Sequence, residues 1–179
     1  MKYFTMNELT HSATAIRKGI DNTPDNTAKA NLTALVANIL DPLREAYGKP
    51  IVVFMRKHPK CVPAFFGCVY GGCYYVPIDE EMPRFRIELI FDNLKPRVML
   101  CDNDTVEMAK TFDFTGETLI YSEVTQTAID DAALADIRDR QLDTDPIYIV
   151  FTSGSTGVPK GVVACHRSVI DYVENLSET

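Results

Sequence analysis

Apolar side chains recur every three or four residues along two segments before residue 48, which is the spacing of one helix face. Thr5 and Glu8 form a capping box at the start of the first segment. Residues 21–27 are rich in Asp, Asn and Thr and predict a turn between the two segments. Pro42 either kinks the second helix or begins a further short one. We expect two amphipathic helices, with inward-facing Met6, Leu9, Ala13, Ile16 and Ile20, and Leu32, Leu35, Val36, Ile39, Leu40 and Leu43.

From residue 51 onward, short apolar runs alternate with helical patterns. Residues 51–55 form a continuous apolar run, which is typical of a strand covered on both faces. Strands separated by helices form right-handed crossovers and a largely parallel sheet. We therefore predict an α/β fold with layered helices, with strands at 51–55, 74–77, 98–101 and 118–121, and helices at 58–71, 83–93, 106–112 and 128–137.

Residues 148–163 follow a different pattern. An apolar β-branched run is followed by a loop rich in glycine and hydroxyl groups and then by a second apolar run, which predicts strand, loop and strand. Apolar residues at helical spacing over 166–176 predict a final helix. Glycines at 154, 157 and 161 allow close approach of the main chain and positive φ. Successive N–H groups, four hydroxyls and Lys160 together favour a bound polyanion, with phosphate as the natural ligand.

Two other phosphate loops are excluded by their spacing. A Walker A loop requires glycine before its lysine and Ser or Thr after it, but Lys160 lies between Pro159 and Gly161. The dinucleotide fingerprint matches Gly154 and Gly157 but lacks a glycine at 152, and a strand is expected to follow. A plain surface turn is the commoner outcome of such a composition. Three glycines, four hydroxyls, a proline and a lysine within ten residues make that alternative less favoured.

Charge and cysteine content narrow the class of protein. A net charge of −7 argues against a nucleic-acid surface, which requires clustered Lys and Arg. The five cysteines form no CxxC pair and no Cys/His cluster, so we expect free thiols in a reducing compartment, with burial as small apolar groups as the simpler interpretation. No apolar stretch has the length of a signal-peptide core or a membrane span. We expect a soluble cytoplasmic protein without membrane contact.

Other polar residues are given structural roles. Asp130, Asp131, Asp136 and Asp139 could be pictured as metal ligands, but a solvated helix face is favoured and we assign no metal ligand. His166 lies close to the loop in sequence, yet a structural or capping role is preferred for it.

The residues from Thr152 to Gly161 resemble the phosphate-loop signature of the adenylate-forming (AMP-binding, ANL) superfamily. Upstream, Phe66 to Asp79 is similar to an earlier core motif of the same superfamily. The segment from Tyr75 to Asp79, taken with the loop, is most like the N-terminal part of an amino-acid adenylation domain of nonribosomal peptide synthetases. The resemblance implies that residues 1–179 are a truncated N-terminal subdomain, with an insertion near 21–49 and a variable link at 122–145.

The resemblance also implies a reaction. ATP and Mg2+ would be used to activate a carboxylate, preferably an amino acid, as acyl-AMP with release of pyrophosphate, and a carrier protein would be a partner of the intact enzyme. Lys160 would be the catalytic cation, neutralising charge that develops on the outer phosphates. The ATP-binding residues implied are Thr152, Ser153, Gly154, Ser155, Thr156, Gly157, Lys160 and Gly161.

Three alternatives stay open at this point. Because the family's downstream motifs have no counterpart here, the isolated chain is expected to be inactive. It could instead be a non-catalytic nucleotide- or partner-binding module, a remnant without a current role, or a fragment of the acyl-CoA synthetase type. Binding of ATP that is lost in a Lys160→Ala variant would separate a working loop from a remnant.

Overall fold

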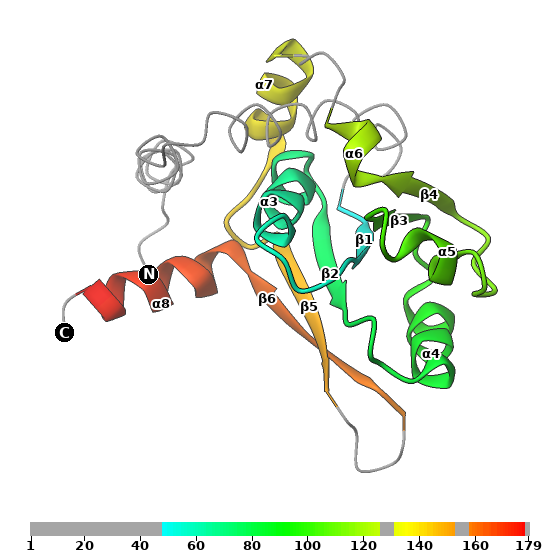
Figure 1. Cartoon of the computed structure of the whole chain (residues 1–179). Helices are drawn as coiled ribbons and strands as arrows, with labels where there is room; N and C mark the ends of the chain where they lie inside the picture. Colours follow the sequence, from blue (N-terminus) through cyan, green and yellow to red (C-terminus); the bar gives the residue numbers. More distant parts are fainter. Residues whose placement is uncertain (1–47, 126–130, 153–157, 178–179) are drawn as a thin grey trace.

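The computed structural model describes residues 48–125, 131–152 and 158–177 (Figure 1). The two helices predicted before residue 48 lie outside these residues, as do residues 153–157 of the glycine-rich loop. The described strands form one six-stranded sheet in the order β4-β3-β1-β2-β5-β6. The predicted α/β fold is therefore confirmed.

The sheet is parallel except at one edge. β1 pairs in parallel with β2 and β3, β3 pairs in parallel with β4, and β2 pairs in parallel with β5. Only the last of the described strands, β6, runs antiparallel to its neighbour, β5. The largely parallel sheet matches the prediction, with strands β1 (Pro50–Phe54), β2 (Tyr74–Ile78), β3 (Val98–Cys101), β4 (Glu117–Ile120), β5 (Pro146–Thr152) and β6 (Lys160–Cys165).

Helices link the strands, and several of their ends differ from prediction. The first begins at 61 and not at 58, because residues 58–61 form a turn with Cys61 N donating to His58 O. The helix expected over 106–112 ends at Ala109, and Tyr121 begins an unpredicted helix instead of ending a strand. The helices are α3 (Cys61–Tyr70), α4 (Arg84–Leu94), α5 (Val106–Ala109), α6 (Tyr121–Val124), α7 (Asp131–Arg140) and α8 (His166–Ser177).

The central strand β1 is covered on both faces, as its apolar run predicts. Ile51 and Val53 face α3 and α6, and pack with Leu100 of β3. Val52 and Phe54 face the opposite side, towards α4 and α5. All four β1 side chains are at most 2% exposed, so this strand is the centre of the two-sided core.

The predicted end of α3 at residue 71 is confirmed to within one residue. Gly71 caps the helix, and Gly72 takes a φ of 74°, a conformation that side-chain-bearing residues resist. Its N–H donates to Val69 O, and the next N–H, that of Cys73, donates to Cys68 O. The chain thus reverses direction within two residues and enters β2.

Candidate functional site

Strand β5, which precedes the glycine-rich loop in sequence, runs towards the edge of the sheet where the parallel strands end. Because β1, β2, β3 and β5 run in parallel, the residues after each strand meet at this carboxyl edge. The chain passes from β1 to β2 and then returns to β3 on the other side of β1. Open α/β sheets bind ligands outside the carboxyl edge near such a reversal. The fold therefore places Thr152 and Lys160, which flank the predicted phosphate loop, on the carboxyl side of the sheet.

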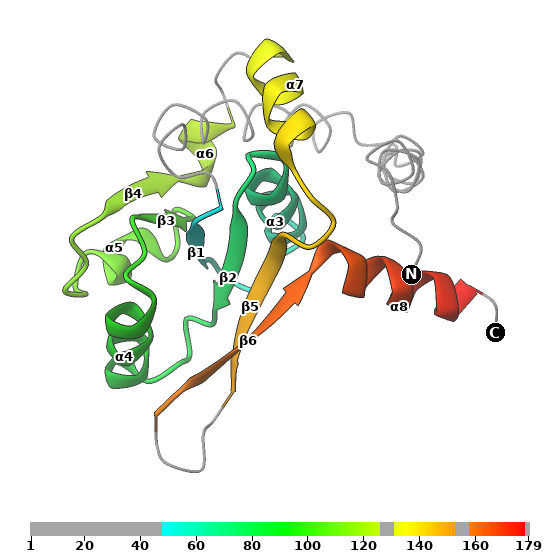
Figure 2. The same ribbon diagram turned by 180° about the vertical axis from the view of Figure 1, so that it is seen from behind.

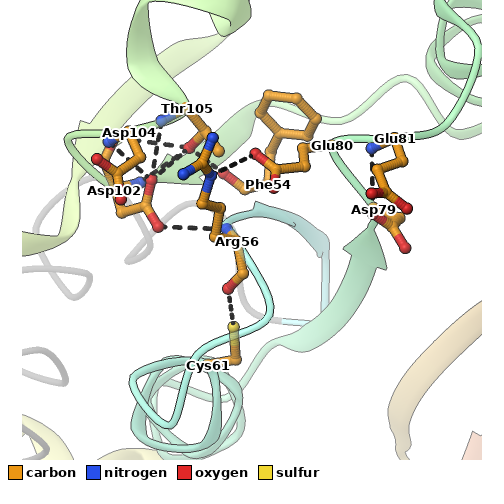
Figure 3. Close-up of polar contacts among 9 residues, drawn as sticks. All are labelled: Phe54, Arg56, Cys61, Asp79, Glu80, Glu81, Asp102, Asp104 and Thr105. Carbon is orange, nitrogen blue, oxygen red and sulfur yellow. Dashed lines mark hydrogen bonds and ion pairs between the residues drawn. The ribbon is translucent and has the colours of Figure 1, made fainter.

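Polar contacts join the three segments that follow β1, β2 and β3 (Figure 3). The Arg56 main-chain N–H donates to Asp102 Oδ2 at 3.2 Å, and Arg56 Nε donates to Glu80 Oε2 at 3.0 Å. Lys57 Nζ lies 2.6 Å from Asp79 Oδ2, and this hydrogen bond lowers the pKa of the Asp79 carboxyl. These contacts link the loops that follow β1, β2 and β3.

Thr105 connects this network to the end of β1. Its side chain is fully buried, and Oγ1 donates to Phe54 O at 2.6 Å. Asp102 Oδ1 accepts from the N–H groups of Thr105 and Asp104 at 2.9 and 3.0 Å. A buried hydroxyl with these contacts connects the end of β1 directly to the loop after β3.

Replacing Thr105 with valine should lower the free energy of unfolding by about 1–3 kcal/mol, because Phe54 O would lose a buried donor. Thr111→Val is the matched control, since the Thr111 hydroxyl donates to Met108 O at 2.7 Å on an exposed turn. Urea unfolding of both variants measures the difference. Equal losses in the two variants would contradict the role given to Thr105.

Two of the predicted ATP-binding residues lie side by side at the ends of the loop. Thr152 and Lys160 are register partners in the β5–β6 hairpin, and Thr152 Oγ1 lies 3.4 Å from Lys160 O. Lys160 is exposed, and within the described part of the chain no acidic side chain forms an ion pair with it. The predicted residues Ser153, Gly154, Ser155, Thr156 and Gly157 lie outside the described residues.

The expectation of a positive φ at Gly161 is wrong. Positive φ occurs among the described glycines only at Gly48 and Gly72, and Gly161 is an ordinary residue of β6. Its lack of a side chain serves cross-strand packing instead. A Cβ at 161 would lie 2.9 Å from Ile149 Cγ2 and 3.3 Å from the Phe151 ring. Glycine therefore lets the side chains of β5 lie across β6 beside the loop.

The opposite end of the hairpin is joined by an ion pair. Arg167 Nε donates to Asp143 Oδ2 at 2.8 Å, and a terminal guanidinium nitrogen contacts the same oxygen. The Arg167 and His166 main-chain N–H groups donate to the carbonyl oxygens of Asp143 and Asp145. Burial lowers the pKa of His166, against the opposing effect of Asp145 and Asp143. Sequence reasoning missed this ion pair, because its partners are 24 residues apart.

The cysteines differ in environment. Cys68, Cys73 and Cys101 are buried as expected, and burial raises the pKa of all three thiols, to about 12 for Cys73 and Cys101. Cys165 is only half-buried, and its Sγ lies 3.0 Å from Ser168 Oγ. Hydrogen bonding to Ser168 lowers the pKa of the Cys165 thiol.

Iodoacetamide at neutral pH should therefore modify Cys165 many times faster than the three buried cysteines, because a lowered pKa increases the thiolate fraction. Peptide mapping of a labelling time course measures each site. Ser168→Ala should slow the Cys165 reaction, since the hydrogen bond that favours the thiolate is removed. Labelling of Cys68 at the same rate as Cys165 in the folded protein would contradict this prediction.

Acidic residues of α7 behave as a solvated face. Asp136 and Asp139 are exposed, and Asp136 pairs with Arg140 one turn along the helix. The side chains of Asp130 and Asp131 lie outside the described residues. Among the described residues, no three or more His, Cys, Asp or Glu side chains form a group that could hold a metal ion. No described helix is long and apolar enough to cross a membrane.

Apolar side chains are exposed along the last described elements. The hairpin and α8 lie at one side of the molecule, and α8 leads away from the sheet (Figure 2). β6 also forms an edge of the described sheet. Exposed apolar side chains can mark an interaction site when they lie together. The residues concerned, each at least 42% exposed, are Val150, Val158, Val162, Val163, Tyr172, Val173 and Leu176.

Comparison with known proteins places this chain in a family. Residues 31–179 match the family model described as AMP-binding enzyme. The D-alanine–D-alanyl carrier protein ligase of Staphylococcus haemolyticus (strain JCSC1435) is 32% identical over 127 residues, covering 70% of this chain and 24% of the relative. The corresponding ligase of Staphylococcus aureus (strain JH9) is 33% identical over 131 residues, covering 73% and 25%. The chain thus spans about a quarter of the length of these curated relatives.

Solved structures with similar folds agree with this family match. A nonribosomal peptide synthetase, FmoA3, in its alpha-methyl-L-serine-AMP bound form matches with a TM-score of 0.65 and 25% identity, covering 82% of this chain and 16% of that one. VinN in complex with L-aspartate matches with a TM-score of 0.63 and 21% identity, covering 83% and 42%, which supports the fold alone. Since the family model covers most of its length, the chain belongs to the AMP-binding enzyme family.

Proposed function

We propose that this chain provides the ATP phosphate-binding part of an adenylate-forming ligase that activates an amino acid as acyl-AMP. The observation that carries the proposal is the position of Thr152 and Lys160 as register partners on either side of the glycine-rich loop, with Lys160 exposed and in no ion pair with another described residue. The named relatives activate D-alanine for a carrier protein, which supports an amino acid and a carrier protein as the partners.

The loop would act electrostatically. When a carboxylate attacks the α-phosphorus of ATP and pyrophosphate leaves, negative charge increases on the β and γ oxygens. The main-chain N–H groups and hydroxyls of residues 152–157 would donate hydrogen bonds to these oxygens, and the Lys160 ammonium would neutralise part of the charge. The acid is already ionised at neutral pH, so no residue here is assigned as a base. Mg2+ supplies further neutralisation when bound to the phosphates, and no residue of this chain is assigned to it.

Other parts of the active site would come from further polypeptide. The chain matches only about a quarter of its relatives, so we propose that residues 1–179 are a partial N-terminal subdomain. The exposed apolar side chains on β6 and α8 support this proposal, because further polypeptide would cover them. We propose that the complete enzyme works in the cytoplasm, and that the chain alone binds ATP weakly without forming acyl-AMP.

A chimera tests the phosphate-binding role. The matching segment of the Staphylococcus haemolyticus ligase is replaced with this chain, so that the relative supplies the other parts of the site. ATP–pyrophosphate exchange that depends on D-alanine is the expected result. Calorimetric titration of the chain alone with MgATP and with pyrophosphate accompanies it. A folded chimera without exchange, together with no binding at millimolar ligand, would favour a remnant without a nucleotide-binding role.

A further inference from the structure

We propose that the ion pair between Asp143 and Arg167 positions the glycine-rich loop, although it lies at the other end of the β5–β6 hairpin. The pair would fix the base of the hairpin, and the hairpin would in turn fix Thr152 and Lys160. This inference rests on the proposed phosphate-binding function of the loop. It assigns a positioning role and no contact with ATP.

The ion pair is the best shielded one among the described residues. The Arg167 and Asp143 side chains are 19% and 11% exposed, whereas every other described ion pair has at least one partner that is 56% or more exposed. The Arg167 N–H also donates to Asp143 O at 2.8 Å, so side chain and main chain hold the same two residues together. Shielding from water weakens screening, which favours a persistent contact.

The hydrogen-bond ladder between β5 and β6 is irregular near the base of the hairpin. Pro146 begins β5 and has no N–H to donate, and the register shifts between Pro146 and Tyr148 opposite Cys165 and Ala164. An irregularity of this kind interrupts the ladder and allows the strand to bend. The Asp143–Arg167 pair lies just beyond the interruption and joins the turn before β5 to the beginning of α8, which follows β6. It therefore closes the hairpin next to the interruption in the ladder.

The base is also tied to the body of the protein. Gln141 Nε2 donates to Val69 O of α3 at 2.7 Å. Leu142 N donates to Asp145 Oδ2 at 2.9 Å and closes the turn that carries Asp143. Arg167 thus attaches the beginning of α8 to a turn that is itself fixed on α3.

Geometry makes the base important for the loop. β5 pairs with β2 at Tyr148, near its beginning, and the hairpin then continues past the ends of the other strands (Figures 1 and 2). Six residues of strand separate the base from Thr152, which is a length of about 20 Å. A tilt of about 5° at the base would then move the loop by about 2 Å, and displacements of this size weaken catalytic contacts.

Asp136 and Arg140 offer a matched control. They are the same residue types, paired within α7, but they are 66% and 56% exposed. The comparison is between Asp143→Asn and Asp136→Asn. Arg167→Lys is a milder second variant, because lysine keeps the charge but not the planar fork.

Hydrogen exchange of the chain without ligand provides the first readout. Asp143→Asn should increase amide exchange in peptides within residues 146–165 by about tenfold, with peptides from β1 and α4 unchanged. Asp136→Asn should change neither. Unchanged exchange in the hairpin, or an equal increase throughout the sheet, would overturn the positioning role. This readout stands even if the chain binds no ATP, in which case only the proposed function fails.

MgATP affinity provides the second readout. Asp143→Asn should raise the Kd for MgATP by about tenfold at a temperature where the variant is folded. In a Lys160→Ala background the same change should have little further effect, because the loop through which it acts is already impaired. The reversed pair, Asp143→Arg with Arg167→Asp, should recover part of the affinity. Full additivity with Lys160→Ala would show a general structural effect and overturn the proposal.

Discussion

A Lys160→Ala substitution should lower ATP–pyrophosphate exchange by the chimeric ligase by about 10²–10³-fold, the usual effect of removing one transition-state charge donor. The reason is the position of the ammonium, which is exposed at the first residue of β6 beside the glycine-rich loop. Without it, charge on the departing pyrophosphate would be neutralised less well. Binding of MgATP to the chain alone should weaken in parallel.

The fold should tolerate this change. An exposed side chain with no ion pair to a described residue contributes little to stability, so the free energy of unfolding should change by no more than about 0.5 kcal/mol. Lys110→Ala is a suitable control, since Lys110 is an exposed lysine that pairs with Glu107 on α5. Exchange at the original rate in a folded Lys160→Ala chimera would remove this lysine from the mechanism.

Local sequence signals were enough to predict most of the sheet. The apolar run at the start of β1 predicts a strand covered on both faces, and Ile51 to Phe54 are indeed buried on both sides. The errors occur at the ends of helices and strands, where a single hydrogen bond can determine the residue at which an element begins. Because of the turn at His58, α3 begins three residues later than predicted. The Tyr121 side chain is buried in the core, and this residue belongs to a helix where a strand was predicted.

The candidate site was predictable only as far as its residues are neighbours in sequence. Thr152 and Lys160 belong to one motif, and the hairpin brings them together. The Arg56–Asp102 contact joins residues 46 apart, and the ion pair at the hairpin base joins residues 24 apart. No periodicity or local motif encodes such contacts. Gly161 was recognised in the motif, but the reason for a glycine there could not be predicted. Its close packing against Ile149 depends on the register of the hairpin, which the sequence does not give.

The largest loss of stability is expected from Phe54→Ala, which should lower the free energy of unfolding by about 3–5 kcal/mol. The Phe54 side chain is fully buried at the end of β1 and meets the Phe112 ring edge-to-face at 5.2 Å. Alanine would leave a cavity between the sheet and α4 that close-packed neighbours fill only in part. Urea unfolding monitored by circular dichroism measures the change.

Phe85→Ala separates burial from residue type. Phe85 is also an aromatic residue on the α4 side of the sheet, but it is 64% exposed, so its loss should cost no more than about 0.5 kcal/mol. Phe54 O accepts the Thr105 hydroxyl, so a shift of the end of β1 should also loosen the loop after β3. Phe54→Ala should therefore increase amide exchange around Asp102 and Thr105 more than around α7. A loss below about 1.5 kcal/mol would mean that the core collapses around the cavity, and that β1 is not the rigid support of the carboxyl edge.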